Sequence, residues 1–177
     1  MNITVIITEL LIMFLIFAFL VIGLLFITPL SFISDYPPEI QEAYYKSQHK
    51  EAVKEKLNAI MLVKKVVALI AFMFIFAWML HLAGAKTFIQ GLLLTYVYAL
   101  ALFAWDTFFL DWVLFANIKK IRLPGTEHMD KECHQKWFHI KVCIPMIPVF
   151  AVVGVLSSLI MLSLIHISEP TRLQLIS

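Results

Sequence analysis

Residues 10–30 read LLIMFLIFAFLVIGLLFITPL and contain no charged side chain. The hydrocarbon core of a bilayer is about 30 Å thick, and an α-helix needs about 20 apolar residues to cross it. Backbone amides must be paired inside lipid, which a helix achieves within itself. The stretch therefore predicts a membrane-crossing helix. No basic region precedes it and no small-residue cleavage site follows it, so we expect it to be retained and not removed as a signal peptide.

The composition of the whole chain agrees with that prediction. Hydrophobic residues make up 62% of its 177 residues and charged residues 15%, whereas soluble domains are about 45–50% apolar. The charges are confined almost entirely to two segments, so the formal net charge of +2 averages over unlike regions. We expect the lipid bilayer as the main environment and no nucleic-acid partner.

Three further segments are apolar enough to cross: residues 66–83, residues 88–115, and a run from residue 142 to beyond residue 161. The prediction is an all-α, polytopic integral membrane protein with four transmembrane helices. Pro145 and Pro148 fall in the first turns of the fourth segment, where they are tolerated and can bend it.

The positively charged residues predict the orientation, because Lys and Arg near the ends of crossings stay in the cytoplasm. The short turn between the second and third segments has only Lys86, and the N-terminus has no basic residue. The two long connections carry the others: Lys46, Lys50, Lys54, Lys56, Lys64 and Lys65 in the first, and Lys119, Lys120, Arg122, Lys131, Lys136 and Lys141 in the second. We expect both connections inside, the N-terminus outside, and a location in a bacterial inner (plasma) membrane.

The first connection is expected to contain an interfacial helix that starts after the Pro37-Pro38 pair. Apolar residues from Ile40 to Met61 recur at loosely helical spacing and lead toward the second crossing. The lysines of this helix either only fix orientation or form a lipid or protein-binding surface.

The stretch LSLIHISEPTR, residues 162–172, resembles the translation of a transposase-adapter oligonucleotide used in sequencing libraries. We therefore expect residues 162–177 to be non-native and residues 1–161 to form one transmembrane domain. His166 and the other polar residues of this tail are left out of any functional argument.

Two carboxylates lie in the third crossing, Asp106 and Asp111. A charged group near the bilayer centre costs about 2.5–3.5 kcal/mol on insertion scales, so both should face protein or water. In an α-helix their separation of five residues places them about 140° apart, which argues against a shared catalytic pair. Each either locks the bundle, by accepting hydrogen bonds or by pairing with a lysine (Lys64, Lys65, Lys119 or Lys141), or serves a proton, ion or substrate path.

Glu9 and His81 lie near the outer ends of the first and second crossings. We expect them to be near one another. They either reach the surrounding water from the interface or form a titratable pair that senses pH or binds a cation.

The second connection is the densest polar stretch and contains the candidate metal ligands. Pro124-Gly125 predicts a turn, and Asp130 is expected to cap a helix that leads into the fourth crossing. On that helix Glu132, His139 and Cys143 would share one face. The full set of candidate ligands is Glu127, His128, His134, His139 and Cys143; the alternative is that these side chains only pack or anchor the helix ends.

Asp111-Trp112, the run Leu123-Pro124-Gly125-Thr126-Glu127 and the following His139 resemble a segment found in a group of small multi-pass bacterial membrane proteins without an assigned activity. The resemblance covers about a third of the chain. It implies that the segment is a recurring feature, and it implies no role for any residue.

The sequence lacks a phosphate-binding Gly-rich loop, a Gly-x-Ser-x-Gly elbow and a His-Glu-x-x-His motif, and it indicates no particular cofactor. Three classes of function remain. The first is a non-catalytic subunit, regulator or assembly factor whose basic connections bind a protein partner. The second is an oligomeric transporter or channel component that uses Asp106. The third is a membrane-embedded, metal-dependent enzyme with its site at the cytoplasmic face.

Overall fold

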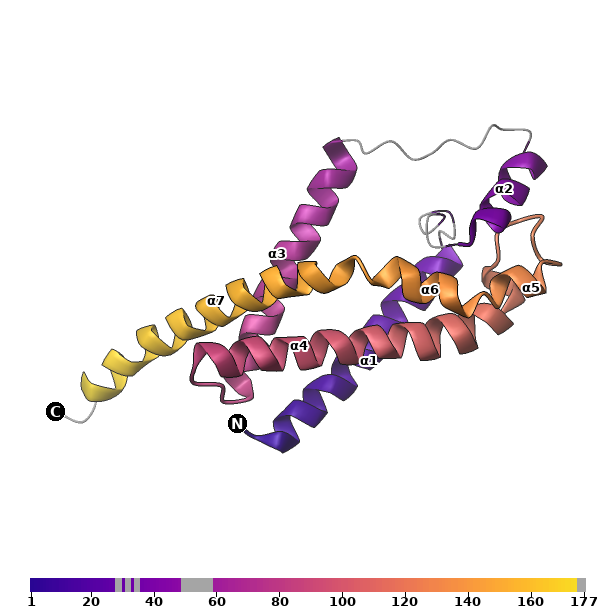
Figure 1. Ribbon diagram of the computed structural model, residues 1–177. Coiled ribbons are helices and arrows are strands. Elements are labelled where there is room, and N and C mark those ends of the chain that lie inside the picture. Colours follow the sequence, from indigo (N-terminus) through magenta and orange to yellow (C-terminus); the bar gives the residue numbers. More distant parts are fainter. Residues whose placement is uncertain (28–29, 31–32, 34–35, 49–58, 175–177) are drawn as a thin grey trace. The chain divides into compact units, whose positions relative to one another are not determined.

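The computed structural model describes the chain except residues 28–29, 31–32, 34–35, 49–58 and 175–177 (Figure 1). Every regular element within the described residues is helical, which confirms the all-α prediction. The elements are α1 (Ile3–Ile27), α2 (Pro38–Ser47), α3 (Ala59–Leu82), α4 (Phe88–Trp105), η2 (Asp106–Phe115), η3 (Lys119–Ile121), α5 (Asp130–Cys133), α6 (Lys136–Cys143) and α7 (Met146–Gln174).

Three helical stretches are long and apolar enough to cross a membrane: Ile3–Ile27, Phe88–Phe115 and Met146–Ile167. The apolar part of α3, Val66–Leu82, is shorter than these. The first of them starts earlier than the sequence indicated, because the Asn2 side chain accepts hydrogen bonds from the N–H groups of Thr4 and Val5 and so caps α1.

The third apolar stretch changes its winding halfway along. It is α-helical through α4, and from Asp106 onward it is the π-helix η2. In a π-helix the hydrogen bonds join residues five apart, so the residue five places along lies roughly one turn further on. The expectation that Asp106 and Asp111 point to well-separated faces is therefore wrong, because it assumed α-helical winding.

The fourth stretch does not begin at residue 142. The helix α6 ends at Cys143, and α7 begins at Met146, on the other side of Pro145. Proline has no N–H to donate and its ring clashes with the preceding turn, which explains the interruption. The helix α7 continues past residue 162, and the foreign origin of that tail stays a prediction.

Asp130 is not the cap of a long helix. It is the first residue of the four-residue helix α5, Met129 precedes it, and no side chain caps that end. A break at His134–Gln135 separates α5 from α6, so Glu132 does not share a continuous helix face with His139 and Cys143 as we expected. In the first connection, α2 begins at the proline pair as predicted. Much of the expected interfacial pattern, including Val53 and Leu57, lies outside the described residues.

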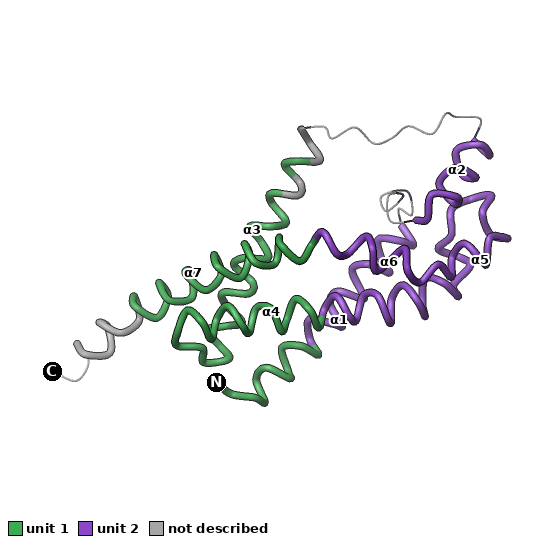
Figure 2. Tube along the Cα trace, viewed as in Figure 1, with its two compact units in different colours: residues 1–11, 57–101, 146–177 green, residues 12–56, 102–145 purple. Residues whose placement is uncertain are grey.

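The chain divides into two compact units, each built from separate parts of the sequence (Figure 2). Unit 1 comprises residues 1–11, 57–101 and 146–177, and unit 2 comprises residues 12–56 and 102–145. In unit 1, α3 packs along α7, and the Ser157 hydroxyl donates a hydrogen bond to the Met73 carbonyl at 3.1 Å. The Phe76 and Tyr98 rings stack with centroids 6.2 Å apart.

Small residues bring α4 and α7 close together within unit 1. A Cβ atom added at Gly91 would lie 2.7 Å from the Ser158 hydroxyl oxygen, and one added at Gly154 would lie 3.0 Å from a Leu92 methyl. The hydroxyls of Thr95 and Ser158 bond to carbonyls of their own helices, four residues earlier. These contacts are typical of helices packed in membranes. In lipid the hydrophobic effect does not drive helices together, so they associate through close packing, which small side chains allow.

Unit 2 has a hydrophobic core of its own. The middle of α1 packs against the junction of α4 and η2, with Phe14 and Trp105 stacked at 4.9 Å between centroids. The buried residues of this core are Leu25, Tyr36, Ile40, Phe115, Ile121, Leu123 and Cys133. The Tyr36 hydroxyl donates to the Ile121 carbonyl at 2.7 Å and so ties the start of the first connection to the second.

Candidate functional site

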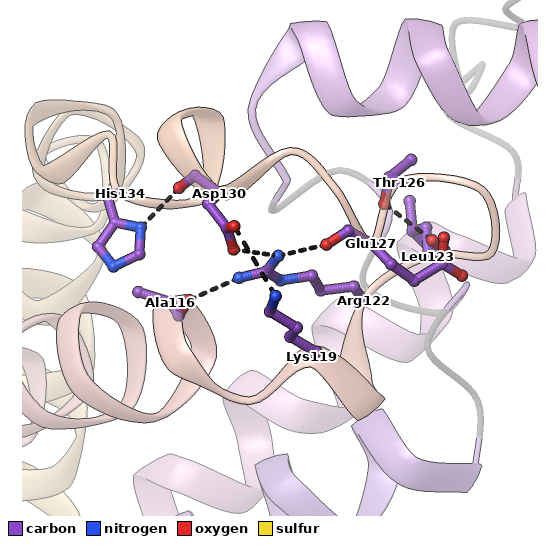
Figure 3. Close-up of polar contacts among 8 residues, drawn as sticks. All are labelled: Ala116, Lys119, Arg122, Leu123, Thr126, Glu127, Asp130 and His134. Carbon is purple, nitrogen blue, oxygen red and sulfur yellow. Dashed lines mark hydrogen bonds and ion pairs between the residues drawn. The ribbon is translucent and has the colours of Figure 1, made fainter.

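The second connection is organised around Arg122, whose side chain is almost fully buried (Figure 3). Its guanidinium donates to the Ala116 carbonyl at 2.9 Å and to the Glu127 carbonyl at 2.7 Å. It also forms an ion pair with the Asp130 carboxylate at 2.6 Å. Because Arg presents several donors in a rigid plane, one side chain joins the end of η2, the loop after η3 and the start of α5.

The Leu-Pro-Gly-Thr-Glu stretch forms the predicted turn, and this turn fixes the loop that Arg122 holds. Gly125 has φ +85°, a backbone angle that glycine adopts without steric cost. The Thr126 hydroxyl donates to the Leu123 carbonyl at 2.8 Å, and the Glu127 carboxylate accepts the Gly125 N–H at 3.1 Å. Backbone N–H groups, those of Glu127 itself and of Gly125, lower the pKa of the Glu127 carboxyl.

Asp130 is the acidic partner of this arrangement. The hydrogen bond from Arg122 lowers the pKa of its carboxyl below the usual range, and the nearby charge of Lys119 adds to that effect. Lys119 lies 3.9 Å from the carboxylate and is largely exposed. The His134 ring Nδ1 lies 2.6 Å from the Asp130 carbonyl oxygen, so that histidine stays beside α5.

Asp111 and His139 are the two predicted site residues that the structure brings into contact. The Asp111 carboxylate lies 3.0 Å from His139 Nδ1 and joins η2 to α6, which pack against one another. Asp111 thus contacts a histidine ring nitrogen and not one of the four lysines, which fits the hypothesis that it accepts a hydrogen bond. His139 is only 5% exposed, and its ring lies edge-on to Phe115 and Phe138.

The chemistry open to this pair is limited by its surroundings. A carboxylate that accepts a hydrogen bond from Nδ1–H leaves Nε2 as the nitrogen that can take up a proton. This is the arrangement of a histidine general base. Here Nε2 is buried and has no hydrogen-bond partner among the described residues. The cavity beside Asp111 measures about 30 Å³, which is room for about two waters. The observed contacts are those of a helix-to-helix lock.

The candidate metal ligands do not gather around one point. Glu127 and His128 are exposed on the loop, and His134 is exposed at the end of α5. Cys143 is half-buried at the end of α6. Among the described residues, no group of three or more His, Cys, Asp or Glu side chains is placed to hold a metal ion.

In unit 1, Glu9 has a partner that the sequence did not indicate. The Tyr98 hydroxyl donates a hydrogen bond to the Glu9 carboxylate, and Tyr98 is fully buried. The His81 ring lies 6.2 Å from that of Trp78. Asp106 occupies the first position of η2 in unit 2 and is half-buried.

Sequence reasoning missed Arg122, Tyr36 and Tyr98. Arg122 was counted as one of the orienting charges, although it stands two residues before the Pro124-Gly125 turn and so had backbone carbonyls within reach on both sides. The two tyrosines lie 85 and 89 residues from their partners. No local pattern connects residues at such separations.

Comparisons with known proteins add no relative: no family model matches the chain, and no curated protein or solved structure matches it.

Proposed function

We propose that this chain is a multi-pass protein of the plasma (inner) membrane that acts as a non-catalytic subunit, regulator or assembly factor. In this proposal its four crossings place the N-terminus outside and both long connections in the cytoplasm. The second connection, with part of the first, binds a protein partner whose surface is acidic.

The observation that carries the proposal is the Arg122-centred set of contacts. The segment between η2 and α6 is held in one conformation by bonds to backbone carbonyls and by its own hydrophobic core. A surface that is already ordered loses little conformational entropy when a partner binds. Exposed lysines stand on two of its elements, Lys120 on η3 and Lys131 on α5. A third, Lys46, stands on α2, which contacts α5. Positive charges of this kind favour association with an acidic surface.

The proposed fourth crossing is α3. Its apolar part alone is short, but all 24 residues of α3 would extend about 36 Å. Lysines at positions 64 and 65 stand near its start, and a lysine near the end of a crossing can extend its ammonium group to the interface.

The orientation is tested with single cysteines in a variant that lacks Cys133 and Cys143. We expect a membrane-impermeant maleimide to label Lys86→Cys in intact cells and to label Lys120→Cys only after the membrane is opened. Labelling of Lys120→Cys in intact cells would reverse the proposed orientation.

The function is tested by crosslinking and purification from native membranes. We expect a defined protein to copurify with the wild-type chain and to be lost from the triple variant Lys46→Gln, Lys120→Gln, Lys131→Gln. Lys86→Gln is the matched control, because Lys86 is exposed and lies on the short turn before α4. Retention of the same partner by the triple variant would remove this surface from the proposal.

One observation favours a second candidate, a transport component that works as an oligomer. Asp106 stands where α-helical winding gives way to the π-helix, and π-helical turns occur frequently at functional sites. In proteoliposomes, Asp106→Asn should then abolish ion or proton flux while the helical content is unchanged. Equal flux from the wild type and the variant would exclude that role for Asp106.

A further inference from the structure

The helix α6 has two unlike faces. One face holds His139, which is buried against η2 through the pair with Asp111. Trp137 is 74% exposed, the highest value among the aromatic side chains of α6. These positions are two apart in the sequence, and at 3.6 residues per turn they point to nearly opposite sides of the helix. The contact with η2 therefore fixes which face of α6 stays uncovered.

The uncovered face combines an indole, a positive charge and an aliphatic side chain. Trp137 and Lys141 of α6, and Ile144, which follows the last residue of α6 with helical backbone angles, stand at intervals of four and three residues. This spacing is one stripe of a helix, and all three are exposed. The sequence of α6, KWFHIKVC, contains two lysines and no acidic residue. Trp is enriched at the level of the lipid headgroups, and Lys near the end of a crossing extends its ammonium group to the same interface.

The position of α6 in the sequence also favours a location at the membrane–water interface. The stretch Met146–Ile167, which is long and apolar enough to cross a membrane, begins shortly after α6 ends at Cys143. The chain immediately before a crossing must pass through the membrane–water interface. A basic cluster beside a crossing attracts the anionic lipids of the cytoplasmic leaflet.

We propose that the Trp137–Lys141–Ile144 face of α6 binds an anionic phospholipid. Lys141 contacts the lipid phosphate, Trp137 lies at headgroup depth, and Ile144 contacts the acyl chains. Lys136 is engaged within the protein, since its ammonium group lies 4.9 Å from the centre of the Trp112 ring of η2. This lipid site rests on the proposed orientation, but it uses none of the lysines assigned to the protein partner, so loss of lipid and loss of partner are distinguished by different variants.

The experiment is native mass spectrometry of the full chain released from detergent micelles that contain equal amounts of phosphatidylglycerol and phosphatidylcholine. We expect the wild type to retain phosphatidylglycerol in preference to phosphatidylcholine. Lys141→Gln should reduce the retained phosphatidylglycerol about fivefold, the effect of one lysine near an anionic surface. Lys86→Gln, a lysine of the α3–α4 turn, should leave it unchanged, and Trp137→Gln should weaken the binding of both lipids.

Circular dichroism of each variant confirms that a loss of lipid is not a loss of fold. Equal retention of the two lipids by the wild type would overturn the proposal. An equal loss from Lys86→Gln and Lys141→Gln would also overturn it, because the effect would then follow net charge. A dimer that dissociates in Lys141→Gln, with no selective lipid retained, would assign this face to a second copy of the chain.

Discussion

Replacement of Arg122 by methionine should open unit 2 without unfolding the rest of the chain. Methionine keeps an unbranched apolar stem and removes the guanidinium, which donates to the Ala116 and Glu127 carbonyls. A hydrogen bond from a charged group contributes about 1.5–3 kcal/mol, and a buried carbonyl left without a donor is costly. Because neighbouring bonds are not additive, we expect the free energy of local opening to fall by about 2–4 kcal/mol.

The thiol of Cys133 reports this opening. Cys133 is 1% exposed in the core that also contains Ile121 and Leu123, the neighbours of Arg122, and burial raises the pKa of its thiol. When closing is faster than labelling, the maleimide reaction rate follows the equilibrium population of the open form. A loss of 2–4 kcal/mol should therefore raise the labelling rate of Cys133 by about 30- to 700-fold. Mass spectrometry of peptides separates this rate from that of the half-buried Cys143.

The matched control is Lys120→Met, which removes a positive charge from an exposed position two residues away. It should leave the Cys133 labelling rate near the wild-type value. An Arg122→Met rate within about threefold of the wild type would refute the reasoning, since that ratio corresponds to well under 1 kcal/mol. A similar rise in the control would show that charge, and not the carbonyl contacts, holds the connection.

Two further predictions concern the packing of unit 1 and the acid stability of unit 2. Gly91→Ala should lower the free energy of unfolding by about 1–3 kcal/mol through overpacking, because the added Cβ meets Ser158. Gly23→Ala meets nothing within 4 Å and is the control; SDS titration followed by circular dichroism measures both, and equal midpoints would contradict the close approach. The pKa of Asp130 is lowered by Arg122 from its usual 3.8, so its contribution to stability is present above that pH and is lost as the pH falls through the lower folded-state value. The difference in unfolding midpoint between the wild type and Asp130→Asn should shrink from pH 6 to pH 3, and a constant difference would disprove the linkage.

Patterns within single segments were enough to predict the helices. Runs such as residues 10–30 must pair their backbone amides internally wherever they lie in lipid, so hydropathy alone indicates α1 and the stretches Phe88–Phe115 and Met146–Ile167. The turn at Gly125 and the start of α2 at the proline pair were equally local, because each depends on the backbone geometry of one or two residues.

Winding and helix breaks were less predictable. The α- and π-helical forms of residues 106–115 have the same hydropathy, so only the structure separates Asp106 and Asp111 by about one turn. Pro145 was recognised as a possible bend, and the structure makes it a break between α6 and α7.

The partners of the polar residues were decided by the tertiary structure. The sequence by itself determined that a carboxylate within an apolar stretch, such as Asp111, needs a partner or water, since charges removed from water must be paired. It did not determine that Asp111 pairs with His139, that Arg122 bonds to backbone carbonyls, or that Glu9 accepts from Tyr98. Each of these contacts joins different elements, and hydrophobic packing of the helices, not local pattern, sets which elements meet.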